Sequence, residues 1–448
     1  MQNAALSDKD QSGTAEQLYV TPSGLVVSWS GHLHNREHLG ATLRIAPTQH
    51  NEEHRIVAAA YERWGVDAFS RFIGEWAAAV LDADRNCILL ARDYSGSRPL
   101  YYKIVSARAE WSSDLASLAA GIEPDKEYLR AWILTNPDPT YTAYKEIRSV
   151  PPGGVVRISR GVHSIFSSWR PDLGASIRYS RSEEYDEEFY SLFRTAVRDR
   201  MQTDQEIWAE LSGGLDSSSV VCMAADILSR EPVSASALQT VSYVLDRGDL
   251  DDEQQYMDEV IRNTGAPTVR LHEHEYSAFF PTLGEPCSPV PIANPGRHSA
   301  VARLMAESGA RVLLTGLGGD AVMWSSPRIC PHVADLLGSF SLRRLNRELL
   351  ACSVSSGRGY WDILWHDAVE GLFPSLRSQI HRRPVPWLIP NPGAAAVDEY
   401  MSGHLADGAD GVTSNTARVY WQNIRDSIRI ASFNAIRVCL GTTPSYPF

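Results

Sequence analysis

The first 165 residues are rich in short, mainly hydrophobic stretches of a pattern typical of strands. Glycine, proline and aspartate separate these stretches and indicate turns. Strands are predicted at residues 17–20, 25–29, 76–82, 87–92 and 154–158. Helices are predicted at residues 53–64, where apolar positions recur at helical spacing, and at residues 129–134. We therefore expect a layered, largely antiparallel α+β domain.

From Ser182 onward, helical and strand patterns alternate. Helices are predicted at residues 182–197, 217–228, 251–263 and 298–307, and strands at residues 206–211, 237–244, 268–271 and 311–315. This alternation is typical of an α/β fold with a doubly wound parallel sheet, whose ligand crevice lies beyond the carboxyl ends of the strands. Beyond residue 325 the pattern is mainly helical.

A stretch rich in proline, glycine and serine, residues 167–182, lies between the two patterns and indicates a connector. We therefore expect two domains, residues 1–170 with the antiparallel sheet and residues 180–448 with the parallel one.

The composition is that of an ordinary folded protein, with 448 residues of which 44% are hydrophobic and 21% are charged. A net charge of -12 disfavours nucleic acid as a partner. The chain has no apolar run of about 18 residues and no secretory signal pattern, so we expect a cytoplasmic protein without a membrane partner. Its 6 cysteines form no C-x-x-C pair, which argues against a zinc ribbon or a disulfide framework.

The most informative motif lies between a predicted strand and a predicted helix. It reads Leu211, Ser212, Gly213, Gly214, Leu215, Asp216, Ser217, Ser218, Ser219. Glycines let the backbone approach a ligand closely, and the free N–H groups of a helix N-terminus attract anions, so the motif predicts a phosphate site. The serines add hydroxyl donors, and Asp216 suits a magnesium ion that bridges phosphate oxygens. The simpler interpretation is a glycine turn followed by a helix cap.

This motif resembles the pyrophosphate-binding loop of ATP pyrophosphatases of the asparagine synthetase family, which includes β-lactam synthetases and lasso peptide cyclases. Residues 315–320, Thr-Gly-Leu-Gly-Gly-Asp, are similar to the second ATP loop of that family. Residues 72–76, 92–102 and 151–154 resemble its glutaminase-type domain, which implies an N-terminal Ntn-hydrolase-like fold. As a family, these enzymes adenylate a carboxylate, release pyrophosphate and pass the acyl group to an amine.

The resemblance implies ATP and Mg²⁺ as ligands and assigns a role to each loop. Residues 212–218 would bind pyrophosphate, and Asp216 and Asp320 would be the catalytic residues that ligate magnesium. The residues that would face the adenosine or complete the second loop are Leu211, Ser242, Thr315, Gly316, Gly318 and Gly319. Alternatively, Gly318, Gly319 and Asp320 form only a turn.

The chain departs from the family at three places. Glutamine-dependent members carry a nucleophilic cysteine after the initiator methionine, whereas this chain has Gln2, so we expect a degenerate glutaminase domain. Leu317 and Ala321 replace acidic residues found in asparagine synthetases, which favours a bulkier, partly apolar substrate. The chain ends at Phe448 without the downstream lysine of the family, so either the C-terminus is truncated or an arginine replaces that lysine. The candidate arginines are Arg297, Arg303 and Arg328.

Substrate-binding residues are expected in the proline-rich segment that precedes the helix predicted at residues 298–307. This segment should overhang the crevice, and its polar residues Glu285, Asn294 and His298 are the candidates. For His298, a helix cap or a surface position is the alternative.

The Gly-Gly-Asp form of the second loop most resembles the lasso peptide cyclases. This resemblance implies a ligase that adenylates an Asp or Glu side chain of a leader-cleaved ribosomal peptide and closes a macrolactam with the peptide's N-terminal amine. By the same resemblance, we expect a leader-binding element and a leader peptidase as partners. The alternatives are a β-lactam synthetase-like or glutamine-independent asparagine synthetase-like ligase, and a noncatalytic scaffold with a degenerate nucleotide site.

Overall fold

A computed structural model describes most of the chain. The described residues are 17–49, 52–106, 108–125, 128, 140–175, 177–203, 205–231, 237–244, 253–275, 295–323, 330–373, 414–433 and 443–445. By packing, the chain divides into two units. The first unit comprises residues 1–170, 179–318 and 428–448, and the second comprises residues 171–178 and 319–427.

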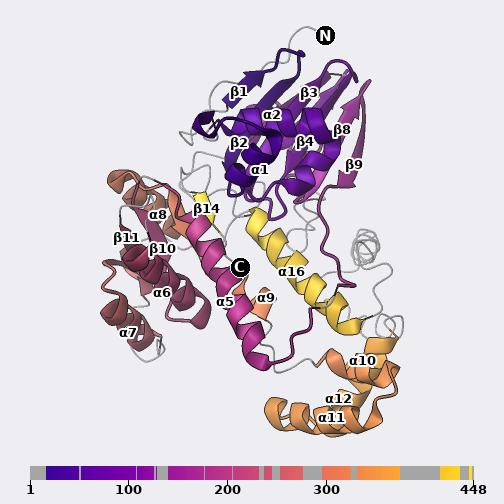
Figure 1. Cartoon of the computed structure of the whole chain (residues 1–448), viewed down its shortest axis with the longest axis vertical. Coiled ribbons are helices and arrows are strands. Elements are labelled where there is room, and N and C mark those ends of the chain that lie inside the picture. The colour runs from indigo at the N-terminus through magenta and orange to yellow at the C-terminus, as the bar shows by residue number, and fades with distance from the viewer. Residues whose placement is uncertain are drawn as a thin grey trace. The chain divides into compact units, whose positions relative to one another are not determined.

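The N-terminal part of the first unit contains an antiparallel sheet with the strand order β1-β2-β3-β4-β8-β9 (Figure 1). Its strands are β1 (Gln17–Val20), β2 (Val26–Leu33), β3 (Gly74–Asp82), β4 (Cys87–Arg92), β8 (Gly154–Ser159) and β9 (Val162–Ser167). A second sheet has the order β6-β5-β7 and consists of β5 (Tyr101–Val105), β6 (Arg108–Ser112) and β7 (Arg148–Ser149). The antiparallel pattern predicted from the sequence is confirmed for these strands.

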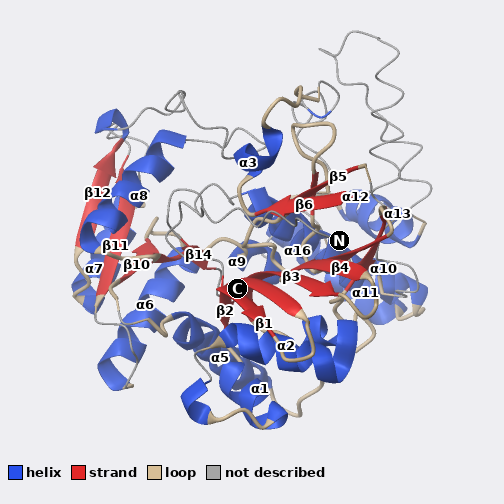
Figure 2. Ribbon diagram, turned by 90° about the horizontal axis from the view of Figure 1, so that it is seen from above, coloured by secondary structure: helices blue, strands red, loops and turns tan. Residues whose placement is uncertain are grey.

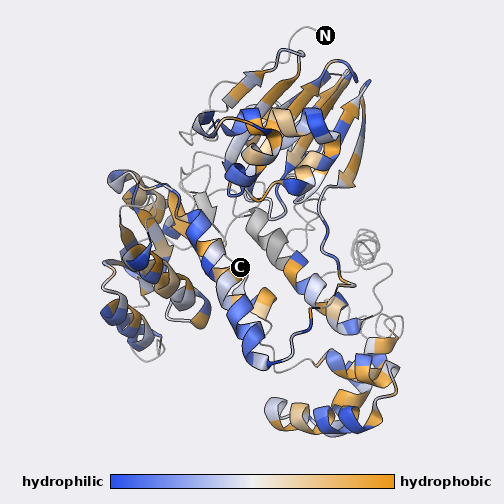
Figure 3. Cartoon of the chain, in the orientation of Figure 1, coloured by the Kyte–Doolittle hydropathy of each residue, from blue (hydrophilic) through white to orange (hydrophobic). Residues whose placement is uncertain are grey.

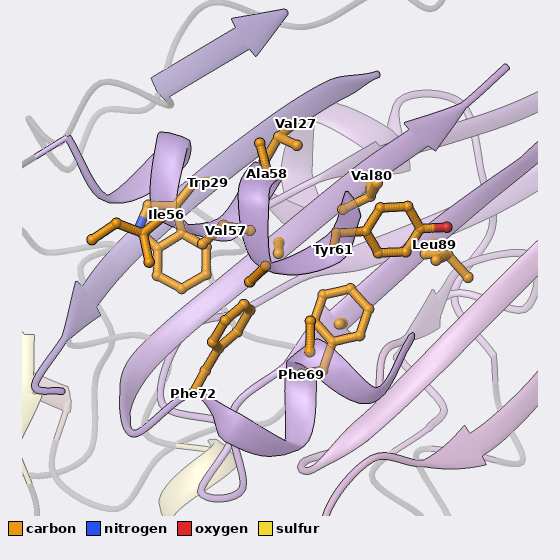
Figure 4. Packing of buried hydrophobic residues seen from close by; sticks show 14 of the residues in the cluster. Val27, Trp29, Ile56, Val57, Ala58, Tyr61, Phe69, Phe72, Val80 and Leu89 are labelled. Atoms are coloured by element: carbon orange, nitrogen blue, oxygen red, sulfur yellow. The ribbon is translucent and has the colours of Figure 1, made fainter. Parts of the chain in front are cut away.

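Each face of the six-stranded sheet carries its own hydrophobic core. On one face, α1 (Arg36–Leu43) and α2 (Glu53–Trp64) cover a core that contains Trp29, Phe72 and Phe69 (Figure 4). On the other face, alternate residues such as Leu90 and Val156 pack against Tyr102 of the second sheet. Figure 3 shows long hydrophobic stretches on these strands, and β3 and β4 are buried along almost their whole length. The domain is therefore layered, as predicted, and α3 (Leu115–Ala119) lies beside the smaller sheet.

The parallel sheet has the strand order β12-β11-β10-β13-β14. Its strands are β10 (Ile207–Glu210), β11 (Leu238–Val244), β12 (Thr268–His272), β13 (Val312–Leu314) and β14 (Thr443–Ser445). The connecting helices are α6 (Leu215–Arg230), α7 (Gln254–Thr264) and α8 (Pro295–Ser308), and α5 (Ser182–Arg200) precedes the sheet (Figure 2). Every pairing in this sheet is parallel, which confirms the predicted α/β arrangement.

The two faces of the parallel sheet also differ. Ile207, Ala209 and Leu211 pack with α5, α6 and α7 on one face. Trp208 and Val241 pack with residues of α8 on the other face. Side chains alternate along a strand, so this assignment also tells on which face of the sheet each residue at the carboxyl ends of β10 and β11 lies.

The described part of the second unit is helical, in agreement with the pattern beyond residue 325. Its elements are α9 (Gly319–Met323), α10 (His332–Gly338), α11 (Leu342–Ser356), α12 (Tyr360–Ile363), a π-helical turn (Leu364–Val369), α13 (Glu370–Leu372) and the part of α16 (Asn415–Phe433) that precedes residue 428. Val333, Leu349 and Ile363 contribute to its core. Nowhere in the described ranges is a helix sufficiently long and apolar to cross a membrane.

Two predicted elements need comment. The helix after the phosphate motif begins at Leu215 rather than at residue 217, because Gly214 already serves as its N-cap residue. The helix predicted at residues 129–134 lies outside the described residues.

Candidate nucleotide site

The first glycine loop follows β10 directly, and α6 begins immediately after it. The side chain of Leu211 is 1% exposed and anchors the end of the strand in the core. Gly214 is the N-cap residue of α6 and provides no side-chain cap, so backbone N–H groups at this end are available to an anion. Asp216 lies in the first turn of this helix.

Two serine hydroxyls hold the loop in shape. The backbone N–H of Ser212 donates to Oγ of Ser217 over 3.1 Å, and the two hydroxyl oxygens lie 3.0 Å apart. The N–H of Gly214 donates to Oγ of Ser212, and Oγ of Ser217 donates to the carbonyl of Gly214, each over 3.3 Å. Ser212 and Ser217 therefore shape the loop in the absence of a ligand, a task that the sequence pattern did not predict.

Gly213 is held between the loop and the start of α7. Its φ is +86°, a conformation that residues with a Cβ adopt rarely. A Cβ built on Gly213 would lie 2.4 Å from the carbonyl oxygen of Glu253, well inside van der Waals contact. Both features require glycine at this position.

The second loop contacts the first directly. It follows β13, and a Cβ built on Gly316 would lie 2.6 Å from the backbone nitrogen of Ser217. Thr315 is 4% exposed, and its Oγ1 accepts the N–H of Leu317 over 3.2 Å. The backbone of Gly316 is thus packed against the peptide bond between Asp216 and Ser217. Two motifs 100 residues apart in sequence form one surface at the carboxyl edge of the sheet.

Two buried hydroxyls near these loops have no hydrogen-bond partner among the described residues. They belong to Ser218 in the first turn of α6 and to Ser242 near the end of β11. Ser242 is 0% exposed and follows Thr240 on the face of the sheet that α6 covers. Because an unpartnered buried hydroxyl is costly, these two groups fit a polar ligand such as a nucleotide.

Two comparisons with known protein families cover most of the chain. The glutamine amidotransferase domain family matches residues 3–169, and the asparagine synthase family matches residues 188–407. Residues 188–407 are thus similar to the asparagine synthase family. Members of this family are ATP-dependent ligases that form carbon–nitrogen bonds and yield AMP and pyrophosphate.

Individual relatives of the asparagine synthase domain include several named proteins. Amidase chyE of Penicillium rubens is 28% identical over 312 residues, which cover 64% of this chain and 45% of that protein. Asparagine synthetase [glutamine-hydrolyzing] 3 of Bacillus subtilis is 25% identical over 52% of this chain and 39% of that protein. Carboxyethyl-arginine beta-lactam-synthase of Streptomyces clavuligerus is 28% identical over 47% of this chain and 39% of that protein. The chain spans less than half the length of these relatives.

The predicted magnesium ligands lie near the two loops in sequence but belong to different units. Asp216 is half-buried in the first unit. Asp320 is exposed in the first turn of α9, which opens the second unit after Gly318 at a φ of +103°. Within the described ranges, no group of three His, Cys, Asp or Glu side chains is arranged to hold a metal. Magnesium commonly takes only one or two carboxylates with phosphate oxygens, so this pairing stays a prediction.

The predicted substrate residues are only partly within the described chain. Glu285 and Asn294 lie outside the described residues. His298 lies on α8 and is 6% exposed, so it is neither a surface residue nor freely accessible. Its role stays a prediction.

One cluster of polar side chains near the first glycine loop could not have been predicted from the sequence. The hydroxyl of Tyr243 donates to Oε1 of Glu210 over 3.0 Å. The guanidinium carbon of Arg297 lies 4.1 Å from the centroid of the Tyr243 ring. Glu210 immediately precedes the phosphate motif, but neither Glu210 nor Tyr243 lies in a motif that marks it. Arg297 was a candidate only because of its place in the sequence.

Proposed function

We propose that this chain is an ATP- and Mg²⁺-dependent ligase that adenylates a carboxylate and passes the acyl group to an amine. The contact of Gly316 with the backbone between Asp216 and Ser217 is the observation that carries the proposal. It joins the two glycine loops where a parallel sheet binds its ligands. The unpartnered hydroxyls of Ser218 and Ser242 lie beside them and suit nucleotide oxygens or nitrogens.

Each part of the loop surface has a role in this reaction. The N-terminus of α6 and the hydroxyl of Ser218 would bind the pyrophosphate portion, and Ser242 would face the nucleoside. Asp216 and Asp320 would hold Mg²⁺, which neutralises charge on the phosphate oxygens when bound. The rigid loop geometry would keep the α-phosphorus in a fixed position for the incoming carboxylate.

For the substrate, we favour a leader-cleaved ribosomal peptide whose Asp or Glu side chain is joined to its own N-terminal amine, as in lasso peptide cyclases. The residues around the second loop support a bulky, partly apolar substrate. Val322 and Met323 of α9 are 42% and 51% exposed. By the same resemblance, Leu317 occupies a position at which asparagine synthetases carry an acidic residue. Holding both reacting groups of one peptide together would replace a bimolecular encounter. A leader-binding element and a leader peptidase would complete the system.

The test compares two aspartates of the same helix. Asp216 lies in the first turn of α6, whereas Asp226 lies farther along and forms surface ion pairs with Arg194 and Arg230. We expect Asp216→Ala to lower pyrophosphate release from MgATP by about a hundredfold or more, because the ion that stabilises the leaving group is lost. Asp226→Ala should retain turnover. Near-normal turnover by Asp216→Ala would contradict the assignment.

The reaction product identifies the substrate class. With a linear peptide that carries an internal Asp or Glu, mass spectrometry should show the loss of one water from the peptide and protection of its N-terminal amine. A gene for a short precursor peptide beside a protease gene would supply the natural substrate for this assay.

A β-lactam synthetase-like reaction is the second candidate, and the similarity to carboxyethyl-arginine beta-lactam-synthase of Streptomyces clavuligerus favours it. In that case, the loss of water would occur from a small amino acid derivative and not from a peptide. A glutamine-independent asparagine synthetase-like ligase would instead form asparagine from aspartate and ammonia. A noncatalytic scaffold would bind ATP and release no pyrophosphate with any of these substrates.

A further inference from the structure

The cluster formed by Glu210, Tyr243 and Arg297 lies at the carboxyl ends of β10 and β11, on the α8 face of the sheet. Tyr243 packs with the core of that face, and Glu210 shares the face with Trp208, two residues earlier on β10. The phosphate loop and α6 lie on the opposite face, where Ala209 and Leu211 point. The cluster is thus at the ligand-binding edge but on the other side from the phosphate loop.

Arg297 is held in place by stacking. Its guanidinium carbon is 4.1 Å from the centroid of the Tyr243 ring, within the range of a cation–π interaction. The hydroxyl of Tyr243 donates to Glu210, which increases the negative character of the ring beneath the cation. This platform restricts the side chain of Arg297, whose planar guanidinium is suited to bidentate contacts.

The charge of Arg297 is not matched by a carboxylate in the described part of the chain. No ion pair joins it to a described Asp or Glu, and its Nε is buried without a hydrogen-bond partner among the described residues. On the same helix, Arg303 is 75% exposed and lies 3.9 Å from Glu307. Because a partly buried cation with an unpaired donor is costly, the position fits an anionic ligand.

We infer that Arg297 binds the carboxylate of the acyl substrate, and that Tyr243 and Glu210 position it. The inference rests on the proposed function and adds the group that would recognise the substrate. A carboxylate is favoured over a phosphate because the phosphate loop lies on the other face of the sheet. Arginine is suited to this role since its two parallel N–H groups match the two oxygens of a carboxylate.

The experiment uses glutarate, a small carrier of a Glu-like carboxylate, and its neutral analogue glutaramide. Both are titrated calorimetrically into the full chain, with and without a non-hydrolysable MgATP analogue. We expect saturable binding of glutarate and none of glutaramide. Arg297→Gln should weaken glutarate binding by about tenfold to a hundredfold, since a charge-assisted hydrogen-bond pair is lost. Arg297→Lys keeps the positive charge but lacks the planar guanidinium, so its affinity for glutarate should lie between that of Arg297→Gln and that of the wild-type chain.

The controls separate this inference from the proposed function. Arg262→Gln removes an exposed arginine of α7 that is paired with Glu259, and it should leave glutarate binding unchanged. Tyr243→Phe keeps the ring but removes the bond to Glu210, and we expect an effect smaller than that of Arg297→Gln. The MgATP analogue should bind equally to Arg297→Gln and to the wild-type chain.

Three results would overturn the assignment of Arg297. They are absence of saturable glutarate binding to the wild-type chain, equal glutarate binding by Arg297→Gln, and a loss in Arg297→Gln of nucleotide affinity alone. A wild-type chain that binds glutarate through Arg297 but takes up no MgATP analogue would instead contradict the proposed function.

Discussion

The Nε atom of Arg200 lies 3.0 Å from Oε1 of Glu75, and both side chains are less than 10% exposed. Glu75 belongs to β3 in the antiparallel domain, whereas Arg200 ends α5, just before the strand that leads to the phosphate loop. Nε2 of His34 lies 2.9 Å from the other carboxylate oxygen of Glu75. Burial disfavours the charged form of Arg200, but Glu75 and Tyr94 outweigh it and raise the pKa of Arg200. A buried ion pair therefore ties the antiparallel sheet to the end of α5, which leads through β10 to the first glycine loop.

Removal of one partner of this pair should be strongly destabilising. We expect Arg200→Met to lower the free energy of unfolding by about 3–5 kcal/mol, because the buried charge of Glu75 loses its arginine partner and keeps only the contact with His34. The matched control is Arg262→Met, which breaks an exposed pair with Glu259 and should cost less than about 1 kcal/mol. Denaturant titration followed by tryptophan fluorescence measures both. An equal decrease in the free energy of unfolding for the two variants would show that the buried pair contributes no more to stability than an exposed pair.

The contact between the two glycine loops predicts that Gly316 cannot be replaced. An added methyl group would meet the backbone of Ser217 at 2.6 Å, so Gly316→Ala must push the loops apart. We expect ATP affinity to fall by about a hundredfold, since the loop geometry is shared by all phosphate contacts. Calorimetric titration with MgATP measures the change. Wild-type affinity in this variant would mean that the contact does not shape the site.

Gly213 allows steric contact to be separated from backbone strain. Gly213 and Gly24 have nearly the same φ, +86° and +85°, but only Gly213 has a neighbour, the carbonyl of Glu253, within reach of a Cβ. Gly24→Ala should therefore cost about 1 kcal/mol of stability from strain alone and leave ATP binding unchanged. Gly213→Ala should cost more and also weaken ATP binding. Similar behaviour of the two variants would remove the role of the Glu253 contact.

The sequence predicted those parts of the site that local chemistry determines. The strand, glycine loop and helix around residues 207–230 and the second loop after β13 follow from turn residues, caps and periodicity, all of which act over a few positions. Their meeting at one edge follows from the topology of a parallel sheet. The same reasoning placed most helices and strands within a few residues of their observed ends.

Other features depend on contacts between distant residues. Nothing near Tyr243 in the sequence shows that its hydroxyl meets Glu210 or that Arg297 stacks on its ring. The pair of Arg200 and Glu75 could not be predicted either, because the two residues lie far apart in sequence and become partners only after folding. The substrate class was inferred mainly from resemblance. The domain boundaries and the predicted site residues also remain predictions.

The unpartnered hydroxyl of Ser242 predicts a loss of binding without a loss of stability. Ser242→Ala removes a buried donor that has no partner in the described chain, so the free chain should be as stable as the wild type or slightly more stable. ATP affinity should fall by about tenfold if the hydroxyl contacts the nucleotide. On the same strand and face, Thr240 donates to the carbonyl of Pro267 over 3.1 Å. Thr240→Val should show the opposite pattern, with lower stability and unchanged ATP affinity. A stability loss in Ser242→Ala would show that its hydroxyl is already satisfied.

Asp335 of α10 caps α16 from another helix. Its carboxylate accepts hydrogen bonds from Oγ of Ser414 and from the backbone N–H of Thr416, each over 2.9 Å, and from Oγ1 of Thr416 over 2.6 Å. Burial raises the pKa of Asp335, but the hydrogen bonds from Thr416, Asn415 and Ser414 outweigh this effect and lower it. The carboxylate therefore stabilises the start of α16 above the unfolded pKa of about 4, and this contribution is lost as the pH falls through the folded value.

Asp335→Asn tests whether the negative charge of Asp335 stabilises the start of α16. At pH about 7, we expect the amides in the first turn of α16 to exchange with solvent about tenfold faster than in the wild type, because a charged cap is replaced by a weaker neutral one. As the pH is lowered through the folded pKa of Asp335, the wild-type side chain also becomes neutral, so the difference should shrink. Hydrogen exchange read by mass spectrometry measures both effects. Asp362→Asn, which removes a half-exposed carboxylate paired with Arg358 in the same unit, should leave α16 unchanged. A difference between Asp335→Asn and wild type that persists at low pH would mean that shape, and not charge, makes Asp335 a cap.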